Sequence, residues 1–343
     1  MTGNRPIAAM LALCTAVLVG AALYFAASIF APLAFALLML AIVWPLQKRL
    51  QTIMPKTLAL LLSLLLTVVV ITVFASMVAW GFSVIGQWMV ANAARFQAVY
   101  VSWADWLEQH DIFIGAMIAE RFDMMWLVRV FHEVAARLNR FAGFALLVFI
   151  FLMMMLLEVE SFGAKLAKSG RPELVQACAE IGWKFRRYML VRTLLRLLTG
   201  LAVWLFARAM GLEPASAWGI IAFALNYIPF IGPFIATILP GAFAMAQFES
   251  WQSIALILVG LMVIQFIIGN YLEPLVAGAA VAISPLAVVF AVFFWACLWG
   301  IPGALIGVPI TIAVLVFCRH SESCRWIAEL FSGKPEETAT GEA

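Results

Sequence analysis

The chain has 343 residues, of which 66% are hydrophobic and only 11% are charged, and its formal net charge is +3. A soluble domain carries about 25% charged residues, so this composition excludes an ordinary soluble protein and indicates a membrane protein. Outside the loops that flank apolar runs, lysines and arginines form no tract interleaved with aromatic residues, which argues against nucleic acid as a partner.

The first half of the chain contains four predicted membrane helices. The apolar run at residues 6–46 is too long for a signal peptide, and we expect two helices with a turn near Ala31 and Pro32. A third run covers residues 57–86. A fourth, residues 141–157, has about the minimum length for crossing a hydrocarbon core of about 30 Å.

Two larger polar segments separate these runs from the rest of the chain. Residues 87–140 place large apolar side chains at helical spacing, which predicts an amphipathic arm on the membrane or on a neighbouring subunit. Ligand binding by the tryptophans of the arm is the alternative. Residues 158–192 mix aromatic and basic side chains, as a helix at the anionic cytoplasmic leaflet does.

The distribution of basic residues predicts the orientation of the chain in the membrane. The loop before residue 57 contains three basic residues and the segment 158–192 contains seven, so both are expected in the cytoplasm. Residues 87–140 contain five arginines but six acidic residues and are expected outside. Both termini are then cytoplasmic, including the tail at residues 319–343.

The C-terminal third combines a lack of basic residues with many prolines. Residues 209–318 contain no lysine or arginine but eight of the fourteen prolines of the chain. A broken helix in hydrocarbon leaves backbone groups unpaired at several kcal/mol each, so it persists only where protein or a water-lined cavity satisfies them. Interrupted membrane helices therefore indicate a transport path.

The first interruption lies in the apolar stretch 215–246. Pro229 and Pro233 lack an N–H donor and Gly232 permits a turn, beside Asn226 and Tyr227. A continuous helix of this length would measure about 48 Å at about 1.5 Å per residue, more than the hydrocarbon core. We therefore expect a helical hairpin that turns at residues 229–233, with a simple kinked span as the alternative.

A second interruption follows about 70 residues later, and a pair of Gly/Pro-interrupted segments is typical of the substrate site of repeat-built transporters. Ser284 and Pro285 are expected to begin one apolar segment. Five residues are expected to interrupt the apolar segment that ends near residue 318, namely Gly300, Pro302, Gly303, Gly307 and Pro309.

Polar residues between the two interruptions are candidates for binding a solute. Glu273, which precedes Pro274, is one of three acidic residues in 209–318, and an ionisable group at membrane depth suggests function. An interfacial glutamate at the cytoplasmic end of a span is the alternative. Gln265 and Asn270 can hydrogen-bond a polar solute. We expect a path between residues 226–233 and 270–278, in which Glu273 sets the charge preference or takes up a proton.

Two arginines precede this region in the fifth predicted span, residues 193–211. Arg196 and Arg208 are expected to snorkel to opposite membrane interfaces. The alternative is that the two arginines form a buried anion site. The transport path would lie near them if Asn270 and Glu273 were not involved.

Enzyme chemistry is not indicated. The three histidines have no cysteine or carboxylate at metal-ligand spacing, and motifs for a serine nucleophile, a nucleotide or zinc are absent from the sequence. We therefore expect no catalytic residues, no metal and no cofactor. A non-transporting membrane scaffold is a further alternative, although a scaffold does not require broken helices.

The motifs resemble those of the autoinducer-2 exporter family of bacterial membrane proteins. The resemblance covers nearly the whole chain and is most specific from residue 225 to 309. It implies about eight spans in the inner membrane and export of the quorum-sensing signal or another small polar solute. Antiport of protons or sodium ions and a homopentamer are also implied. Gly269 stands where many members have an acidic residue before Asn270, which weakens the case for cation coupling there.

The predicted fold is therefore an all-α polytopic membrane protein with amphipathic helical segments on both faces. Its predicted segments are three spans in 1–86, an extracytoplasmic arm in 87–140, a fourth span in 141–157, a cytoplasmic basic segment in 158–192, a transport core in 193–318 and a cytoplasmic tail in 319–343.

Overall fold

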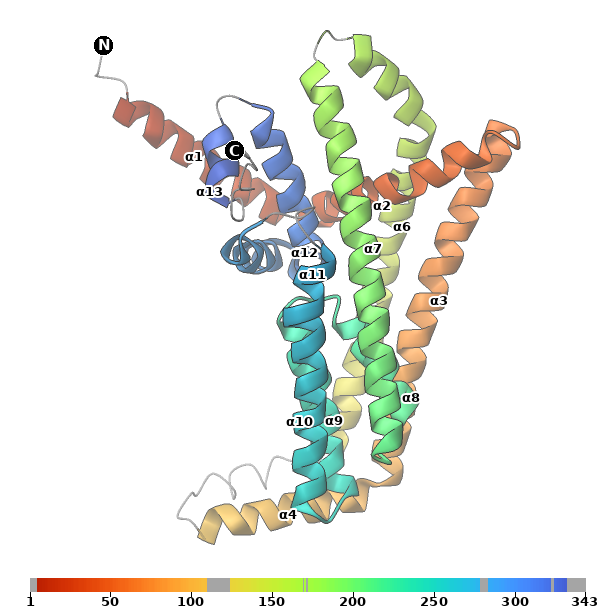
Figure 1. Cartoon of the computed structure of the whole chain (residues 1–343), viewed down its shortest axis with the longest axis vertical. Coiled ribbons are helices and arrows are strands. Elements are labelled where there is room, and N and C mark those ends of the chain that lie inside the picture. The colour runs from red at the N-terminus through yellow and green to blue at the C-terminus, as the bar shows by residue number, and fades with distance from the viewer. Residues whose placement is uncertain are drawn as a thin grey trace, which may run out of the picture. The chain divides into compact units, whose positions relative to one another are not determined.

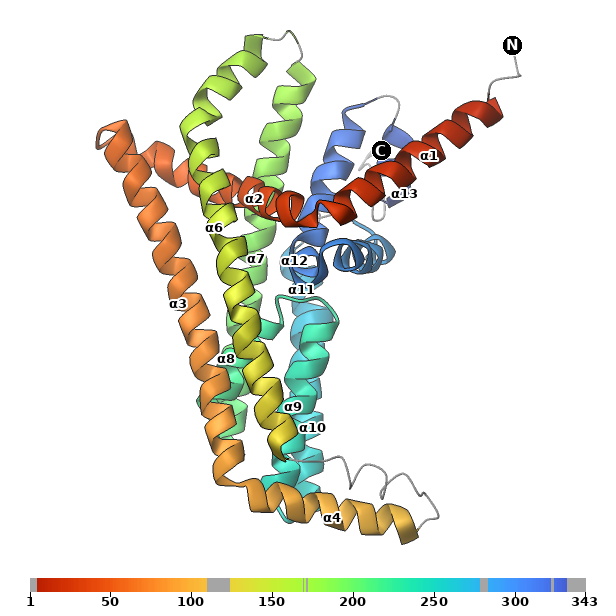
Figure 2. The same cartoon turned by 180° about the vertical axis from the view of Figure 1, so that it is seen from behind.

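The computed structural model describes residues 5–109, 124–168, 170, 172–277, 283–321 and 324–331, and it is built of helices joined by turns (Figures 1 and 2). Among these residues, six helices are long and apolar enough to cross a membrane. They are Ala27–Leu50, Lys56–Ala91, Gly143–Lys168, Pro172–Ala209, Trp251–Leu272 and Pro285–Arg319. Shorter apolar helices accompany them, so the predicted all-α polytopic class is confirmed.

The chain divides into two compact units. Unit 1 comprises Met1–Leu65, Gly143–Met189 and Gly278–Ala343, and unit 2 comprises Leu66–Ala142 and Leu190–Ala277. The first predicted interruption and the polar residues after it belong to unit 2, whereas the second interruption belongs to unit 1.

Unit 1 contains α1 (Arg5–Phe25) and α2 (Ala27–Leu50), which pack on each other and on α12 (Pro285–Arg319) (Figure 2). The predicted turn near Ala31 and Pro32 is wrong, because the chain turns at Ala26. Pro32 is buried inside α2, where the carbonyl four residues earlier belongs to the first turn of the helix. The Pro32 ring therefore disturbs only the first turn of α2, since little helix precedes it.

Helix α12 contains the second interruption. Ser284 caps the helix by accepting a hydrogen bond from the Ala287 N–H at 3.2 Å, and Pro285 follows in the first turn, as predicted. The apolar sequence already begins at Leu275, but this residue belongs to the short α11 (Glu273–Ala277). The cap explains the later start, since proline at the first helical position lacks an N–H that would be unpaired there anyway.

Within α12 only Gly300 leaves the helical conformation, with φ 64° and ψ −141°. The prediction that Pro302, Gly303, Gly307 and Pro309 also interrupt the helix is wrong. Pro302 lies in the first turn after the break, where its missing N–H removes little. Gly303 and Gly307 instead let the chain pass close to the preceding part of α12, since a Cβ at Gly303 would lie 2.5 Å from a backbone carbonyl carbon.

Unit 2 contains the predicted hairpin, formed by α8 (Ala215–Leu225) and α9 (Ile231–Gln247). Helix α9 packs on α10 (Trp251–Phe266) and on α4 (Ala93–Gln109), as Figure 1 shows. The core of this unit is apolar, and the Trp218 ring meets Phe243 edge-on with centroids 4.7 Å apart. The hairpin prediction is thus confirmed.

Glycines bring α8 close to α7 (Pro172–Ala209). A Cβ at Gly219 would lie 2.6 Å from the Trp204 Cβ and 2.8 Å from the Gly200 carbonyl oxygen. Small residues of this kind allow the backbones of membrane helices to approach closely. The hairpin therefore packs on α7 at Gly200 and Trp204, one to two turns beyond Arg196.

Several predicted segment borders fall inside helices. Helix α6 (Met124–Lys168) continues through residue 141, and α7 continues through residue 193. The helical nature of the arm is confirmed for α4 and for residues 124–140. Residues 110–123 of the arm and 332–343 of the tail lie outside the described residues.

Candidate functional site

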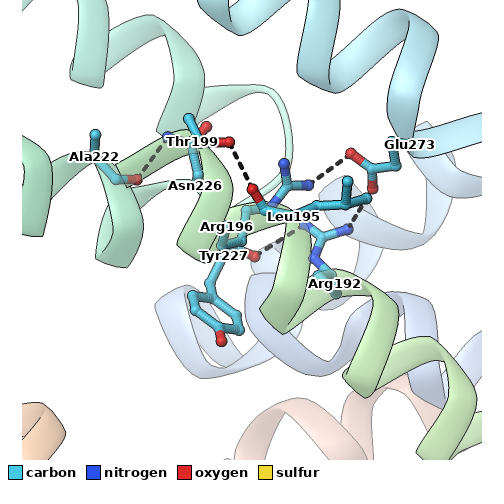
Figure 3. Close-up of polar contacts among 8 residues, drawn as sticks. All are labelled: Arg192, Leu195, Arg196, Thr199, Ala222, Asn226, Tyr227 and Glu273. Carbon is cyan, nitrogen blue, oxygen red and sulfur yellow. Dashed lines mark hydrogen bonds and ion pairs between the residues drawn. The ribbon is translucent and has the colours of Figure 1, made fainter. Parts of the chain in front are cut away.

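Three charged side chains of unit 2 converge on one place (Figure 3). Arg196 donates from Nη2 to the Glu273 Oε2 at 2.7 Å, and the Arg192 Nη1 lies 3.5 Å from the Glu273 Oε1. The two arginines are four residues apart on α7 and therefore share one helix face. Glu273 begins α11, directly after the π-helical segment η1 (Ile267–Leu272).

The charges of this triad are largely removed from water by the protein itself. The side chains of Arg192 and Arg196 are 7% and 6% exposed, against 29% for Glu273. Burying ions costs several kcal/mol each, and replacing a buried ion pair by apolar residues is often neutral or stabilising. Stability alone therefore gives no reason for this triad, which makes it the leading candidate for a functional site.

Arg192 also connects the triad to the hairpin. Its Nη2 donates to the Tyr227 carbonyl oxygen at 3.1 Å, and the Tyr227 hydroxyl donates to the Thr193 Oγ1 at 3.0 Å. Tyr227 lies in the turn between α8 and α9. The structure thus brings the 226–233 turn and Glu273, two predicted parts of the path, to the same arginine.

Asn226 adds a buried polar group beside Tyr227. It is fully buried and donates from Nδ2 to the Ala222 carbonyl at 2.6 Å, while its Oδ1 has no hydrogen-bond partner among the described residues. Gln265 on α10 likewise has a buried Nε2 without a partner in that part of the chain. An unpaired buried group costs about 1–3 kcal/mol, so each can gain from a partner supplied by a ligand or by water.

The hairpin turn differs in position from the prediction. It covers residues 226–230, and Phe230 adopts φ 64°, a strained value for a bulky residue. Gly232 and Pro233 lie in the first turn of α9 instead. Proline is tolerated there because the first helical N–H groups have no partner within the helix.

Gly232 is required by close packing rather than by its backbone angles. A Cβ at this position would lie 2.6 Å from the Leu225 carbonyl carbon and 3.1 Å from the Asn226 Cα. The hairpin therefore closes only if residue 232 has no side chain, and this closure positions Asn226 and Tyr227.

The π-helical segment places Asn270 on an exposed part of unit 2. Segments of this kind are rare and frequently occur at functional sites. Pro274 follows in α11, whereas Gly278 lies outside the described residues. The structure thus separates Glu273, which reaches the arginines, from Asn270, which is exposed.

The expectation that Arg196 snorkels to an interface is wrong, because Arg196 is buried and paired with Glu273. The physical reason is that a carboxylate within hydrogen-bond distance replaces the water that snorkelling would reach. Arg208 is exposed in the last turn of α7. Arg192 was missed as a site residue because it belongs to the basic run 158–192, although its spacing from Arg196 was a usable signal.

The remaining candidates belong to unit 1. Ser284 and Pro285 begin α12, Gly303 packs against the helix backbone, and Pro309 is buried within α12. Their place in a transport path stays a prediction. Among the described residues, no group of three or more His, Cys, Asp or Glu side chains is arranged to hold a metal ion.

Comparisons with known proteins agree with the resemblance noted in the sequence. A family model described as AI-2E family transporter matches residues 13–323. The "AI-2 transport protein TqsA" of Escherichia coli K12 is 34% identical over 187 residues, which cover 54% of this chain and 54% of that protein. A "Putative transport protein" of Borreliella burgdorferi is 31% identical over 196 residues, or 56% of this chain and 53% of the other.

A third similar protein, the "Putative transport protein YhhT" of Escherichia coli K12, is 32% identical over 155 residues, or 45% of this chain and 44% of that protein. The chain thus spans about half the length of the relatives it matches. The relatives are transport proteins by name, in agreement with the expectation that the chain is not an enzyme.

Proposed function

The chain belongs to the AI-2E transporter family, and on that premise we propose that it exports a small polar solute of the autoinducer-2 kind by secondary transport. The observation that supports this most directly is the buried triad of Arg192, Arg196 and Glu273 joined to the Tyr227 carbonyl. Polar groups of this kind in an apolar bundle offer a hydroxylated solute partners that replace water.

Each polar group has a role in this proposal. Arg192 and Arg196 donate hydrogen bonds to oxygens of the solute, because a guanidinium group has only donors. The Asn226 Oδ1 accepts a hydrogen bond from a solute hydroxyl, since it has no other partner among the described residues. Asn270, which is exposed, makes an early contact with the solute at the entrance of the path.

Cation/proton antiport by Glu273 is the second candidate, and the geometry favours it less. A sodium ion entering the triad would meet two arginines within 4 Å of the only carboxylate of the triad. Like charges at such distances repel by several kcal/mol at the effective dielectric of a protein. A solute that accepts hydrogen bonds is therefore the better match.

We also propose that the chain works as a homo-oligomer, a pentamer by family resemblance, in the bacterial inner membrane with cytoplasmic termini. Native mass spectrometry of the protein extracted in mild detergent tests the assembly, and a monomeric mass under all conditions would contradict it.

A proteoliposome assay tests transport itself. Vesicles with purified full-length protein are loaded with autoinducer-2, and its release is compared with that from protein-free vesicles. We expect Arg196→Gln to lower the release rate roughly 10- to 100-fold, because a charge-assisted hydrogen bond contributes about 1.5–3 kcal/mol.

Arg95→Gln is the matched control, because Arg95 is an exposed arginine of α4 away from the triad. Size-exclusion chromatography of each variant separates a transport defect from misfolding. Equal release from wild-type and protein-free vesicles would refute export of this solute and would favour a membrane scaffold.

A further inference from the structure

Two cysteines of unit 1 are in contact with each other. Cys318 lies in the last turn of α12, and Cys324 directly precedes α13 (Arg325–Phe331). A hydrogen bond joins their two side chains. The chain turns tightly between them, because the Ser321 N–H donates to the Cys318 carbonyl at 3.1 Å and the Cys324 N–H donates to the Ser321 carbonyl at 3.2 Å. The fold thus pairs two of the five cysteines of the chain.

The two thiols differ in their access to water. Cys318 is buried, with 7% of its surface exposed, whereas Cys324 is half-buried. Oxidation of a thiol depends on its exposure as well as on its thiolate content, so a dissolved oxidant reaches Cys324 first. An accessible cysteine beside a second thiol that can resolve it is typical of redox-sensing pairs.

Helix α12, which ends beside this pair, is folded back on itself at Gly300. The Trp295 Nε1 donates to the Thr311 Oγ1 at 3.3 Å, and a Cβ at Gly307 would lie 2.9 Å from the Ala291 carbonyl oxygen. Both contacts join a residue before the break to a residue after it. The first and last turns of α12 therefore lie at the same end of the folded helix.

Helix α13 connects these two ends. The Phe331 carbonyl accepts a hydrogen bond from the Ser284 N–H at 3.0 Å, and the Phe331 ring stacks on Phe290 with centroids 6.5 Å apart. The end of α13 is thus attached to the start of α12. A bond between Cys318 and Cys324 would attach the start of α13 to the end of α12, so that α13 is held at both of its ends.

We propose that Cys318 and Cys324 form a reversible disulfide when a peroxide oxidises them, and that this bond fixes α13 against α12. The Cys324 thiolate attacks one oxygen of hydrogen peroxide, the O–O bond breaks, and the released hydroxide takes up the proton that Cys324 had lost. The Cys318 sulfur then attacks the sulfenic sulfur of Cys324. The S–S bond forms, the S–O bond breaks, and the Cys318 proton leaves with the oxygen as a second water. The two thiols lose two electrons in total, and the peroxide gains them.

This chemistry suits the cytoplasmic side of the membrane, where the C-terminal tail is proposed to lie. Thiols are kept reduced there, and the disulfides that do form are usually transient and catalytic or redox-sensing. The pair is therefore reduced at rest, oxidised by peroxide and restored by thiol reductants. The oxidation site goes beyond the transport function and does not depend on which solute is carried.

Mass spectrometry of the purified full chain tests the disulfide. Reduced protein in peroxide-free detergent is treated with hydrogen peroxide, alkylated and digested. We expect a peptide pair linked through Cys318 and Cys324, which dithiothreitol separates. Cys178→Ser, at an exposed cysteine of α7, is the matched control and should form the same link. Absence of a link, or a link from either cysteine to a third one, would overturn the proposal.

Single substitutions test the order of the two steps. In Cys318→Ser the sulfenic acid of Cys324 lacks its resolving thiol, so dimedone should label Cys324. In Cys324→Ser the buried Cys318 should gain roughly tenfold less label, because the oxidant reaches it less easily. Equal labelling of the remaining cysteine in the two variants would contradict the assigned order of attack.

Hydrogen exchange measures the effect on α13. The amides of α13 should exchange roughly tenfold or more slowly in the oxidised protein than in the reduced protein, because a disulfide across the turn restricts local unfolding. Peroxide-treated Cys324→Ser should show no such slowing. Unchanged exchange in the disulfide-linked protein would refute the part of the proposal in which the bond fixes α13.

Discussion

Replacing Gly232 by alanine should open the hairpin and disturb the triad through it. The added Cβ would lie 2.6 Å from the Leu225 carbonyl carbon, whereas carbon atoms in contact are about 3.5–4.0 Å apart. The start of α9 must therefore move by about 1 Å relative to the end of α8. The clashing atoms belong to the backbone, so a side-chain rotation cannot relieve the contact.

Helix propensity, overpacking and a lost hydrogen bond together determine how Gly232→Ala changes the free energy of unfolding. Alanine is favoured over glycine in a helix by about 1 kcal/mol. Overpacking costs about 1–3 kcal/mol, and a shift of about 1 Å would also break the 3.1 Å hydrogen bond from Arg192 to the Tyr227 carbonyl, at about 1.5–3 kcal/mol. The clash dominates, and we expect a net loss of about 2–4 kcal/mol.

Thermal unfolding in detergent at a fixed scan rate, followed by tryptophan fluorescence, measures this loss. We expect the midpoint to fall by about 5–15 °C. The matched control is Gly143→Ala, because a Cβ at this helical glycine meets no atom within 4 Å, and its midpoint should stay the same or rise. A Gly232→Ala midpoint equal to the wild-type value would show that the hairpin is not closed by this contact.

The two remaining predictions concern the other break and the orientation. Gly300→Ala should lower the unfolding midpoint of the full chain, because φ 64° with ψ −141° strains any residue with a Cβ by about 1–3 kcal/mol. Gly20→Ala, at a position with open space for a Cβ, should leave the midpoint unchanged. Equal midpoints for the two variants would argue against the break at Gly300. In a cysteine-free background, a cysteine replacing Gln109 should react in intact cells with an impermeant reagent, because residues 87–140 are expected outside. Reaction only after the membrane is broken would reverse the predicted topology.

The hairpin can be predicted from the sequence because it follows from the length of one apolar stretch and from the backbone chemistry of proline and glycine. A 32-residue apolar stretch with Pro229, Gly232 and Pro233 near its middle is too long for one span and contains the residues that favour a turn. The turn position was harder to predict. Proline and glycine also fit the first turn of a helix, so α9 begins before Pro233 rather than after it.

The triad could be predicted only in part. Arg196 and Glu273 were both notable as rare charges in an apolar region, but 77 residues separate them, and local patterns carry no information on such a pairing. Their contact depends on how α7 packs in unit 2, where the backbone approach at Gly200 and Gly219 sets the position of the helix. That packing requires the three-dimensional structure.

The π-helical segment η1 affects the direction in which the side chains after it point around the helix axis. A π-helical turn holds more residues than an α-helical turn, so Ile267–Leu272 sets the angle at which Glu273 leaves the axis of α10. Deleting any one residue of this segment would rotate all that follows by about 100° and turn the carboxylate away from α7. The number of residues between α10 and Glu273, as much as their identity, therefore decides whether the acid meets its two arginines.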